Sequence, residues 1–160
     1  MDSGNPHSRT GRAVLDGAIT LPGGGLVRGR GLRHGLPPGP TPAFGLYLGS
    51  RRAAARHDEA LTWPRRWLVW PDFRLPRHPT EAADAVVGTH HRIVDLGEDV
   101  EVACGGGVGR TGTVLACLAV LDGLGPDEAV AWVRAHHHRR AVETPGQRRW
   151  VHRFAAGHPA

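Results

Sequence analysis

The segment from Asp99 to Val114 constrains the fold of this 160-residue chain more than any other part of it. It opens with an alternating Val-Glu-Val-Ala run, which is typical of a short buried strand. A glycine-rich loop follows at 105–109, and the apolar residues after the loop recur at helical spacing. A strand that passes through a tight loop into a helix is characteristic of α/β folds. We therefore expect a strand at 99–103 and a helix from Arg110 to Gly123.

The rest of the chain predicts further strands that alternate with helices. Short apolar runs predict strands at 44–48 and 67–70. Between Arg12 and Leu32 the apolar stretches are interrupted at 22–25 by Pro-Gly-Gly-Gly, which predicts a hairpin or two edge strands. Together with the helices, these strands predict an α/β sandwich in which helices flank a central, mainly parallel sheet.

Three more segments have helical character. One runs from Pro79 to Leu96 with Thr80 as its expected N-cap, and another runs from Gly125 to His138. The last opens at Thr144-Pro145.

The residue types at 104–110 favour the binding and attack of a phosphate group. A glycine-rich loop that opens a helix can direct successive backbone N–H groups toward one anion. Cys104, just before the glycines, supplies a nucleophile, and Arg110 supplies a planar fork that can hold two phosphate oxygens. A thiolate that faces a bound phosphate group is the arrangement that cysteine-dependent phosphatases use.

The same loop fits other interpretations less well. The run 107–112 satisfies the G-x-G-x-x-G pattern of dinucleotide-binding folds, but the residues after it predict helices and no second strand for that unit. The nucleoside-triphosphate loop fails because Cys104 and Arg110 stand where that pattern requires Gly and Lys. A purely structural turn would use the glycines for positive φ, but it would explain neither Cys104 nor Arg110.

An aspartate upstream of the loop is the candidate proton donor. Attack of a thiolate on phosphorus expels an oxyanion, which a proton donor must meet. Trp70-Pro71-Asp72 follows a predicted strand, and Pro71 and Pro76 stiffen the loop that carries Asp72. A turn residue after a strand is the alternative for Asp72. With W-P-D upstream of C-x5-R-[ST], the chain resembles the protein tyrosine phosphatase and dual-specificity phosphatase superfamily, in particular its compact bacterial members.

The resemblance covers residues 44 to 155 approximately and implies a role for each motif residue. Cys104 would be the nucleophile, Arg110 the phosphate clamp and Asp72 the general acid. The hydroxyl of Thr111 would stabilise the thiolate. The backbone amides that would cradle the phosphate belong to Gly105, Gly106, Gly107, Val108, Gly109 and Arg110. The family usually has a histidine before the nucleophile, and Ala103 stands there instead, which leaves the thiolate less favoured.

The sequence Thr144-Pro145-Gly146-Gln147 has two interpretations. It has the form of a capping box, with Thr144 as N-cap and the Gln147 side chain reaching back to the backbone. It also resembles the superfamily's T-P-x-Q loop, whose glutamine positions a water against the phosphocysteine intermediate. We therefore include Gln147 among the predicted catalytic residues.

The predicted function is hydrolysis of phosphotyrosine, with phosphoserine and phosphothreonine as further options, through a phosphocysteine intermediate. Two alternatives stay open. Ala103 keeps open a catalytically silent phospho-binding module on the same fold. A phosphoinositide or other small-molecule phosphatase can share the loop, although residues 105–109 carry no basic side chain that would favour a polyanionic headgroup.

Composition limits the partners and the organisation of the chain. The net charge of +5 favours anionic partners, and we attribute it to phosphorylated protein or peptide substrates. No arginine-rich run is interleaved with aromatics as a nucleic-acid groove would require. No membrane-length apolar stretch or signal peptide is present, so we expect a cytoplasmic protein. We also expect it to be a monomer. We expect residues 1–11 to be a disordered tail and 12–160 to be a single phosphatase domain.

Other conspicuous residues receive structural interpretations. Cys117 is too far along the predicted helix to form a disulfide with Cys104, and we expect it to be buried among apolar residues. Adjacent histidines at 90–91 and 136–138 point in different directions on a helix and lack ligands at metal spacing. The segment from His136 to Arg140 is interpreted as a cationic helix end. We expect neither a metal nor a cofactor.

Overall fold

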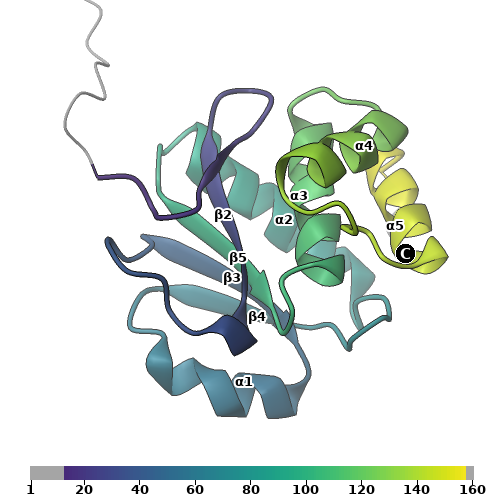
Figure 1. Cartoon of the computed structure of the whole chain (residues 1–160). Helices are drawn as coiled ribbons and strands as arrows, with labels where there is room; N and C mark the ends of the chain where they lie inside the picture. The colour runs from purple at the N-terminus through teal and green to yellow at the C-terminus, as the bar shows by residue number, and fades with distance from the viewer. Residues whose placement is uncertain (1–12, 158–160) are drawn as a thin grey trace, which may run out of the picture.

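The structure, a computed structural model, describes residues 13–157 as a five-stranded sheet with helices on both faces (Figure 1). The predicted disordered tail at 1–11 lies outside the described residues. The strand order across the sheet is β1-β2-β5-β3-β4. The strands are β1 (Ile19–Thr20), β2 (Leu26–Gly31), β3 (Phe44–Gly49), β4 (Arg65–Val69) and β5 (Val100–Cys104).

The strand directions agree with the predicted sheet. β1 is antiparallel to β2, whereas β2–β5, β5–β3 and β3–β4 are parallel pairs. The prediction of a mainly parallel sheet is therefore confirmed. The segment between Arg12 and Leu32 forms a hairpin, but β2 is not an edge strand, because β5 pairs along its other side.

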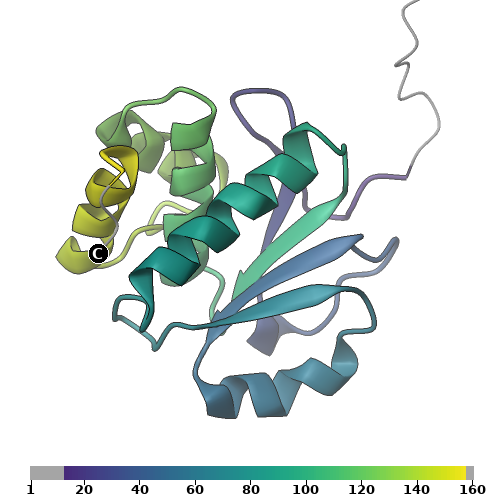
Figure 2. The same ribbon diagram turned by 180° about the vertical axis from the view of Figure 1, so that it is seen from behind.

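Helices α2 to α5 cover one face of the sheet, and α1 lies on the other (Figures 1 and 2). None of the helices in residues 13–157 is long and apolar enough to cross a membrane. The helices are α1 (Arg51–His57), α2 (Pro79–Val94), α3 (Gly109–Leu121), α4 (Pro126–His136) and α5 (Pro145–Ala155), with short 3-10 turns η1 (Leu32–His34) and η2 (Asp58–Ala60).

One helix prediction was wrong, and one helix was not predicted. Helix α2 begins at Pro79 with His78 as its N-cap, so the prediction that Thr80 is the N-cap was wrong. Proline fits the first helical position because its missing N–H would have no partner there. Helix α1 was not predicted, because it buries no residue and therefore shows no apolar stripe. Its N-cap is Ser50, whose hydroxyl accepts the N–H of Ala53 at 3.1 Å.

Strand β5 divides its side chains between two cores. Val100, Val102 and Cys104 join the larger core, which is formed with helices α2 to α5. Glu101 and Ala103 point to the opposite face, where Ala103 packs in a smaller cluster with Tyr47 and Trp63. This alternation fixes which residues of β5 can meet the loop that follows it.

A buried polar network lies on the smaller face of the sheet. The Glu101 carboxylate accepts hydrogen bonds from the Nε of Arg28 at 3.0 Å, the Nη2 of Arg30 at 3.2 Å and the Tyr47 hydroxyl at 2.7 Å. The Tyr47 hydroxyl in turn accepts the indole N–H of Trp63 at 2.7 Å. Burial, followed by the charge of Glu101, raises the pKa of Tyr47 far above its usual range. The network ties β2, β3 and β5 together beneath the loop at 105–108.

Candidate active site

The loops that carry the motif residues meet at one edge of the sheet. Strands β3, β4 and β5 are parallel, so their carboxyl ends lie at the same edge. Strand β5 ends at Cys104 and helix α3 begins at Gly109, while β4 leads into the loop that carries Asp72. The sheet topology therefore brings together segments that are more than thirty residues apart in the chain.

The sulfur of Cys104 is held by two hydrogen-bond donors. It accepts the backbone N–H of Gly107 at 3.2 Å and the hydroxyl of Thr111 at 3.1 Å. Only 2% of Cys104 is exposed. The Thr111 hydroxyl therefore makes the contact with the sulfur that the resemblance implies.

Gly107 is required for the shape of this loop. Its φ is +74°, a region that side chains disfavour. A β-carbon at this position would also lie only 2.5 Å from the backbone nitrogen of Gly31 on β2. Gly107 thus lets the loop turn back against the sheet and direct its N–H at Cys104.

Arg110 connects the start of α3 to the ends of two neighbouring strands. Its Nη1 donates to the carbonyl of Trp70 at 2.9 Å and to that of Leu48 at 3.3 Å. The side chain is buried, and its Nε has no hydrogen-bond partner among the described residues. A buried guanidinium N–H without a partner is costly, and it is satisfied when an anion binds the fork.

Asp72 lies beside Arg110 on a loop that is more exposed. Its Oδ1 is 3.2 Å from the Nη2 of Arg110, and its Oδ2 is 3.9 Å from the Nη2 of Arg33. The loop is held by the indole N–H of Trp70, which donates to the carbonyl of Arg74 at 2.8 Å. The next residue, Phe73, has a φ of +56°, which is unusual for a side chain of this size.

Gln147 completes the capping box that the sequence indicated, three residues after the N-cap Thr144. Its Oε1 accepts the backbone N–H of Glu143 at 2.8 Å and that of Thr144 at 3.3 Å, and the capping box of α5 is complete. Among the described residues, Gln147 forms no hydrogen bond with Cys104, Arg110 or Asp72. The capping interpretation is therefore confirmed, and a catalytic role stays a prediction.

His137 contacts the loop at 105–108, which the sequence did not indicate. Its Nε2 donates to the carbonyl of Gly107 at 2.7 Å, and its ring lies against Gly29 of β2. Burial lowers the pKa of His137, which keeps the imidazole neutral near pH 7. The interpretation of 136–140 as a cationic helix end is therefore wrong for this residue. A contact between positions thirty residues apart leaves no local sequence signal.

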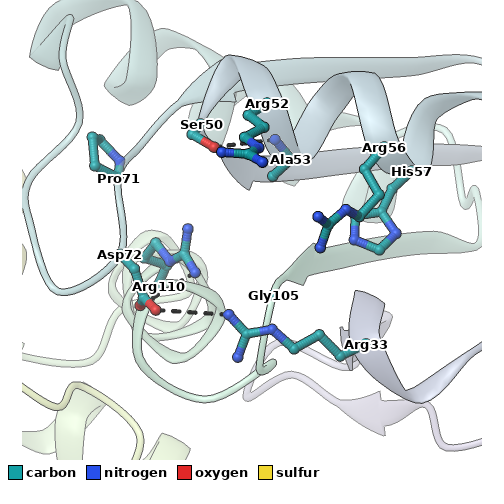
Figure 3. A pocket seen from close by; sticks show the side chains of 10 residues that line it. All are labelled: Arg33, Ser50, Arg52, Ala53, Arg56, His57, Pro71, Asp72, Gly105 and Arg110. Carbon is teal, nitrogen blue, oxygen red and sulfur yellow. Dashed lines mark hydrogen bonds and ion pairs between the residues drawn. The ribbon is translucent and has the colours of Figure 1, made fainter.

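A pocket of about 480 Å³ lies over Gly105 and Arg110 (Figure 3). Pro71 and Asp72 line one side of it, and residues of α1 and η1 line the other. The sequence pattern indicated no basic residue outside the loop, because these side chains reach the pocket only through the chain topology. The basic residues that line it are Arg33, Arg52, Arg56, His57 and Arg110.

The second cysteine behaves as predicted. Cys117 is fully buried inside α3 and forms no disulfide. Burial raises the pKa of its thiol well above the usual value. It is therefore a packing residue, whereas Cys104 immediately precedes Gly105, which lines the pocket.

Solved structures share this fold. Tk-PTP in its active form matches with a TM-score of 0.62 and 24% identity, over 72% of this chain and 79% of that one. Kinase associated phosphatase, with its catalytic cysteine changed to serine, matches with a TM-score of 0.60 and 16% identity over 71% and 68%. PTPMT1 in complex with PI(5)P matches with 0.56 and 15% over 71% and 76%. The fold is that of dual-specificity and tyrosine phosphatases.

Sequence comparison defines the family more closely. Two uncharacterized proteins of Methanocaldococcus jannaschii are 34% and 33% identical to this chain, over 73% of it and over 86% and 79% of their own lengths. The family model of the "Swiss Army Knife protein, DSP-PTPase phosphatase domain" matches residues 77–157, which include the Cys104 loop. The chain belongs to this family. It is a phosphatase, an enzyme that hydrolyses phosphoric monoesters.

Proposed function

We propose that this phosphatase transfers the phosphoryl group of its substrate to Cys104 and then to water. One observation carries the proposal: a buried sulfur with two donors directed at it lies beside a buried arginine whose fork has an unpartnered N–H. The first feature suits a nucleophilic thiolate, and the second suits a bound phosphate.

In the first step, the sulfur–phosphorus bond forms as the ester phosphorus–oxygen bond breaks. Arg110 and the backbone amides of 105–110 hold the non-bridging oxygens, where negative charge develops. The leaving oxygen takes a proton from the carboxyl group of Asp72. The products of this step are the free alcohol and phosphocysteine.

The ion pair between Asp72 and Arg110 places the carboxyl group beside the phosphate-binding side chain, as an acid role requires. A phosphate dianion that binds Arg110 competes with the Asp72 carboxylate for the same guanidinium group. Two anions side by side repel each other, and protonation of Asp72 relieves that repulsion. Substrate binding thus favours the protonated carboxyl group that the first step requires.

In the second step, water attacks the phosphorus of phosphocysteine. The sulfur–phosphorus bond breaks, the water gives a proton to the Asp72 carboxylate, and inorganic phosphate leaves. The family resemblance gives the placement of this water to Gln147. Since the Oε1 of Gln147 is occupied by the helix cap, its Nε2 group would make that contact.

Two classes of substrate are candidates. Phosphotyrosine in a protein is the substrate that the motifs predict. A phosphoinositide or small-molecule phosphate is the second, and the basic side chains around the pocket favour it. The neighbour PTPMT1 was solved with PI(5)P, but at 15% identity that likeness concerns the fold, so the choice depends on the pocket of this chain.

Turnover of para-nitrophenyl phosphate tests the mechanism. We expect Cys104→Ser to abolish turnover and to retain phosphate binding, because a serine hydroxyl is barely ionised. Cys117→Ala is the matched control and should retain the wild-type rate. Mass spectrometry after an acid quench should find the phosphoryl group on Cys104. Near wild-type turnover by Cys104→Ser would exclude the mechanism, and phosphate binding by a wild type without turnover would favour a silent binding module.

A further inference from the structure

The pocket carries more positive charge than one phosphate group needs. Arg110 and the amides of 105–110 suffice for a single phosphate. Three further arginines and the imidazole of His57 face the same space from η1 and α1 (Figure 3). We call this group the basic wall; it consists of Arg33, Arg52, Arg56 and His57. Asp72 is the only acidic residue among the described residues that line the pocket.

The basic wall is not neutralised within the part of the chain that the structure describes. Arg52 and Arg56 are exposed and form no ion pair with any carboxylate in residues 13–157. Arg33 reaches only Asp72, at 3.9 Å. By contrast, Asp58, directly after α1, is occupied by Arg65 and Trp67. The charges of its three arginines are therefore available to a ligand.

Part of the basic wall is close to the Cys104 loop, the glycine-rich segment at 105–108. A β-carbon on Gly105 would lie 3.0 Å from the Nη2 of Arg33 and 3.4 Å from the Nη2 of Arg110. Two guanidinium groups thus meet over one glycine, although like charges repel. Burial and the charges of Arg56, Arg30 and Arg33 all lower the pKa of His57. An anion beside the Cys104 loop would relieve this repulsion.

We propose that the basic wall binds a second phosphate group of the substrate, next to the one that is hydrolysed. This inference rests on the proposed function. The substrate is then a compact scaffold, such as a phosphorylated polyol ring, that carries two closely spaced phosphate groups. A singly phosphorylated tyrosine side chain offers no second anionic group to Arg52 and Arg56. The same chemistry occurs in free bisphosphates and in lipid headgroups.

The test compares an inositol bisphosphate, with phosphates on adjacent carbons, with the matching inositol monophosphates. We expect wild-type kcat/KM to favour the bisphosphate by about tenfold or more, since a charge-assisted contact is equivalent to about one such factor. The preference should shrink as salt rises, because the wall is exposed. Phosphatidylcholine vesicles that contain the same headgroup as a lipid show whether a free or a membrane-borne source is preferred.

Single variants localise the effect. Arg52→Gln and Arg56→Gln should each lower the ratio of bisphosphate to monophosphate kcat/KM by several-fold, and the double variant should remove the preference. Arg51→Gln is the matched control, because Arg51 lies on the same helix and does not line the pocket. It should leave the ratio unchanged. An unchanged ratio in the double variant, or a wild-type preference for phosphotyrosyl peptides, would overturn the inference.

Binding to the Cys104→Ser variant separates this inference from the proposed function. Calorimetry should show tighter binding of the bisphosphate than of the monophosphates, and this readout needs no turnover. If para-nitrophenyl phosphate is hydrolysed through Cys104 but the bisphosphate and the monophosphates bind equally, the inference about the basic wall is wrong and the proposed mechanism is supported. If the bisphosphate binds tightly but Cys104 is not required for turnover, the proposed mechanism is wrong and the binding of a second phosphate group by the basic wall is supported.

Discussion

The Cys104 loop and the Asp72 loop differ in how they are held. Cys104 and Arg110 are almost fully buried, and the residues between them are fixed by contacts with β2 and His137. Asp72 is about half exposed, and among residues 13–157 its carboxylate contacts only Phe73 of its own loop, Arg110 and Arg33. The phosphate-binding part is thus already in place, whereas the proton donor depends on ion pairs that a phosphate would displace. Binding and proton transfer should therefore respond differently to mutation.

Arg110→Lys should have the largest effect. An ammonium group cannot hold two phosphate oxygens at once, and it also loses the bonds to Trp70 and Leu48. We expect kcat/KM to fall by at least about 10³-fold, whatever the leaving group. The measurement is turnover of para-nitrophenyl phosphate and of an alkyl phosphate. Activity within a few-fold of wild type would show that Arg110 is only a structural residue at the start of α3.

Asp72→Asn should affect only the substrates that need a proton. For alkyl phosphates we expect a loss of about 10²-fold or more, the lower end for proton transfer by a positioned side chain. The loss should be much smaller for para-nitrophenyl phosphate, whose leaving group is stable as an anion. The alkaline limb of the bell-shaped rate profile should also disappear. Equal losses for both substrates would identify Asp72 as a turn residue instead.

His137→Asn tests whether the Cys104 loop depends on its contact with α4. Loss of the bond to Gly107 should lower kcat several-fold, because one hydrogen bond contributes about 1 kcal/mol. It should also change the pH dependence of Cys104 alkylation by iodoacetate, which a distant structural defect would leave alone. His136→Asn is the control, because within the described part of the chain His136 bonds only to its own helix. Identical alkylation profiles in both variants would remove His137 from the site.

Ala103→His should restore the usual histidine of the superfamily but should not fit. Ala103 is fully buried beside Tyr47 and Trp63, so the larger side chain must displace them. We expect the free energy of unfolding in urea to fall by about 1–3 kcal/mol, as for other overpacked cores. Ala55→His, on the exposed side of α1, is the control. Unchanged stability would show that this side of β5 has room for the histidine.

The sequence predicted the elements whose residues show periodicity, and it failed where contacts are non-local. β5, α3 and the cap of α5 were predicted because each is encoded within a few neighbouring residues. Helix α1 has no buried face and therefore no periodic signal. Arg56 and His137 approach the Cys104 loop only after the sheet has formed. The motif residues could thus be found in the sequence, but the surroundings of the pocket could not.

The buried network around Glu101 has a consequence for the accuracy of the site. In a strand, a shift of one residue moves every side chain to the opposite face. Such a slip of β5 would place the Glu101 carboxylate among Leu46, Leu48 and the apolar side of α3, far from Arg28 and Arg30. An unpaired charge in that position is prohibitively costly, so a sheet in which β5 is shifted by one residue is strongly destabilised. A carboxylate that takes no part in the chemistry thereby ensures that the sulfur three residues later arrives at the correct position.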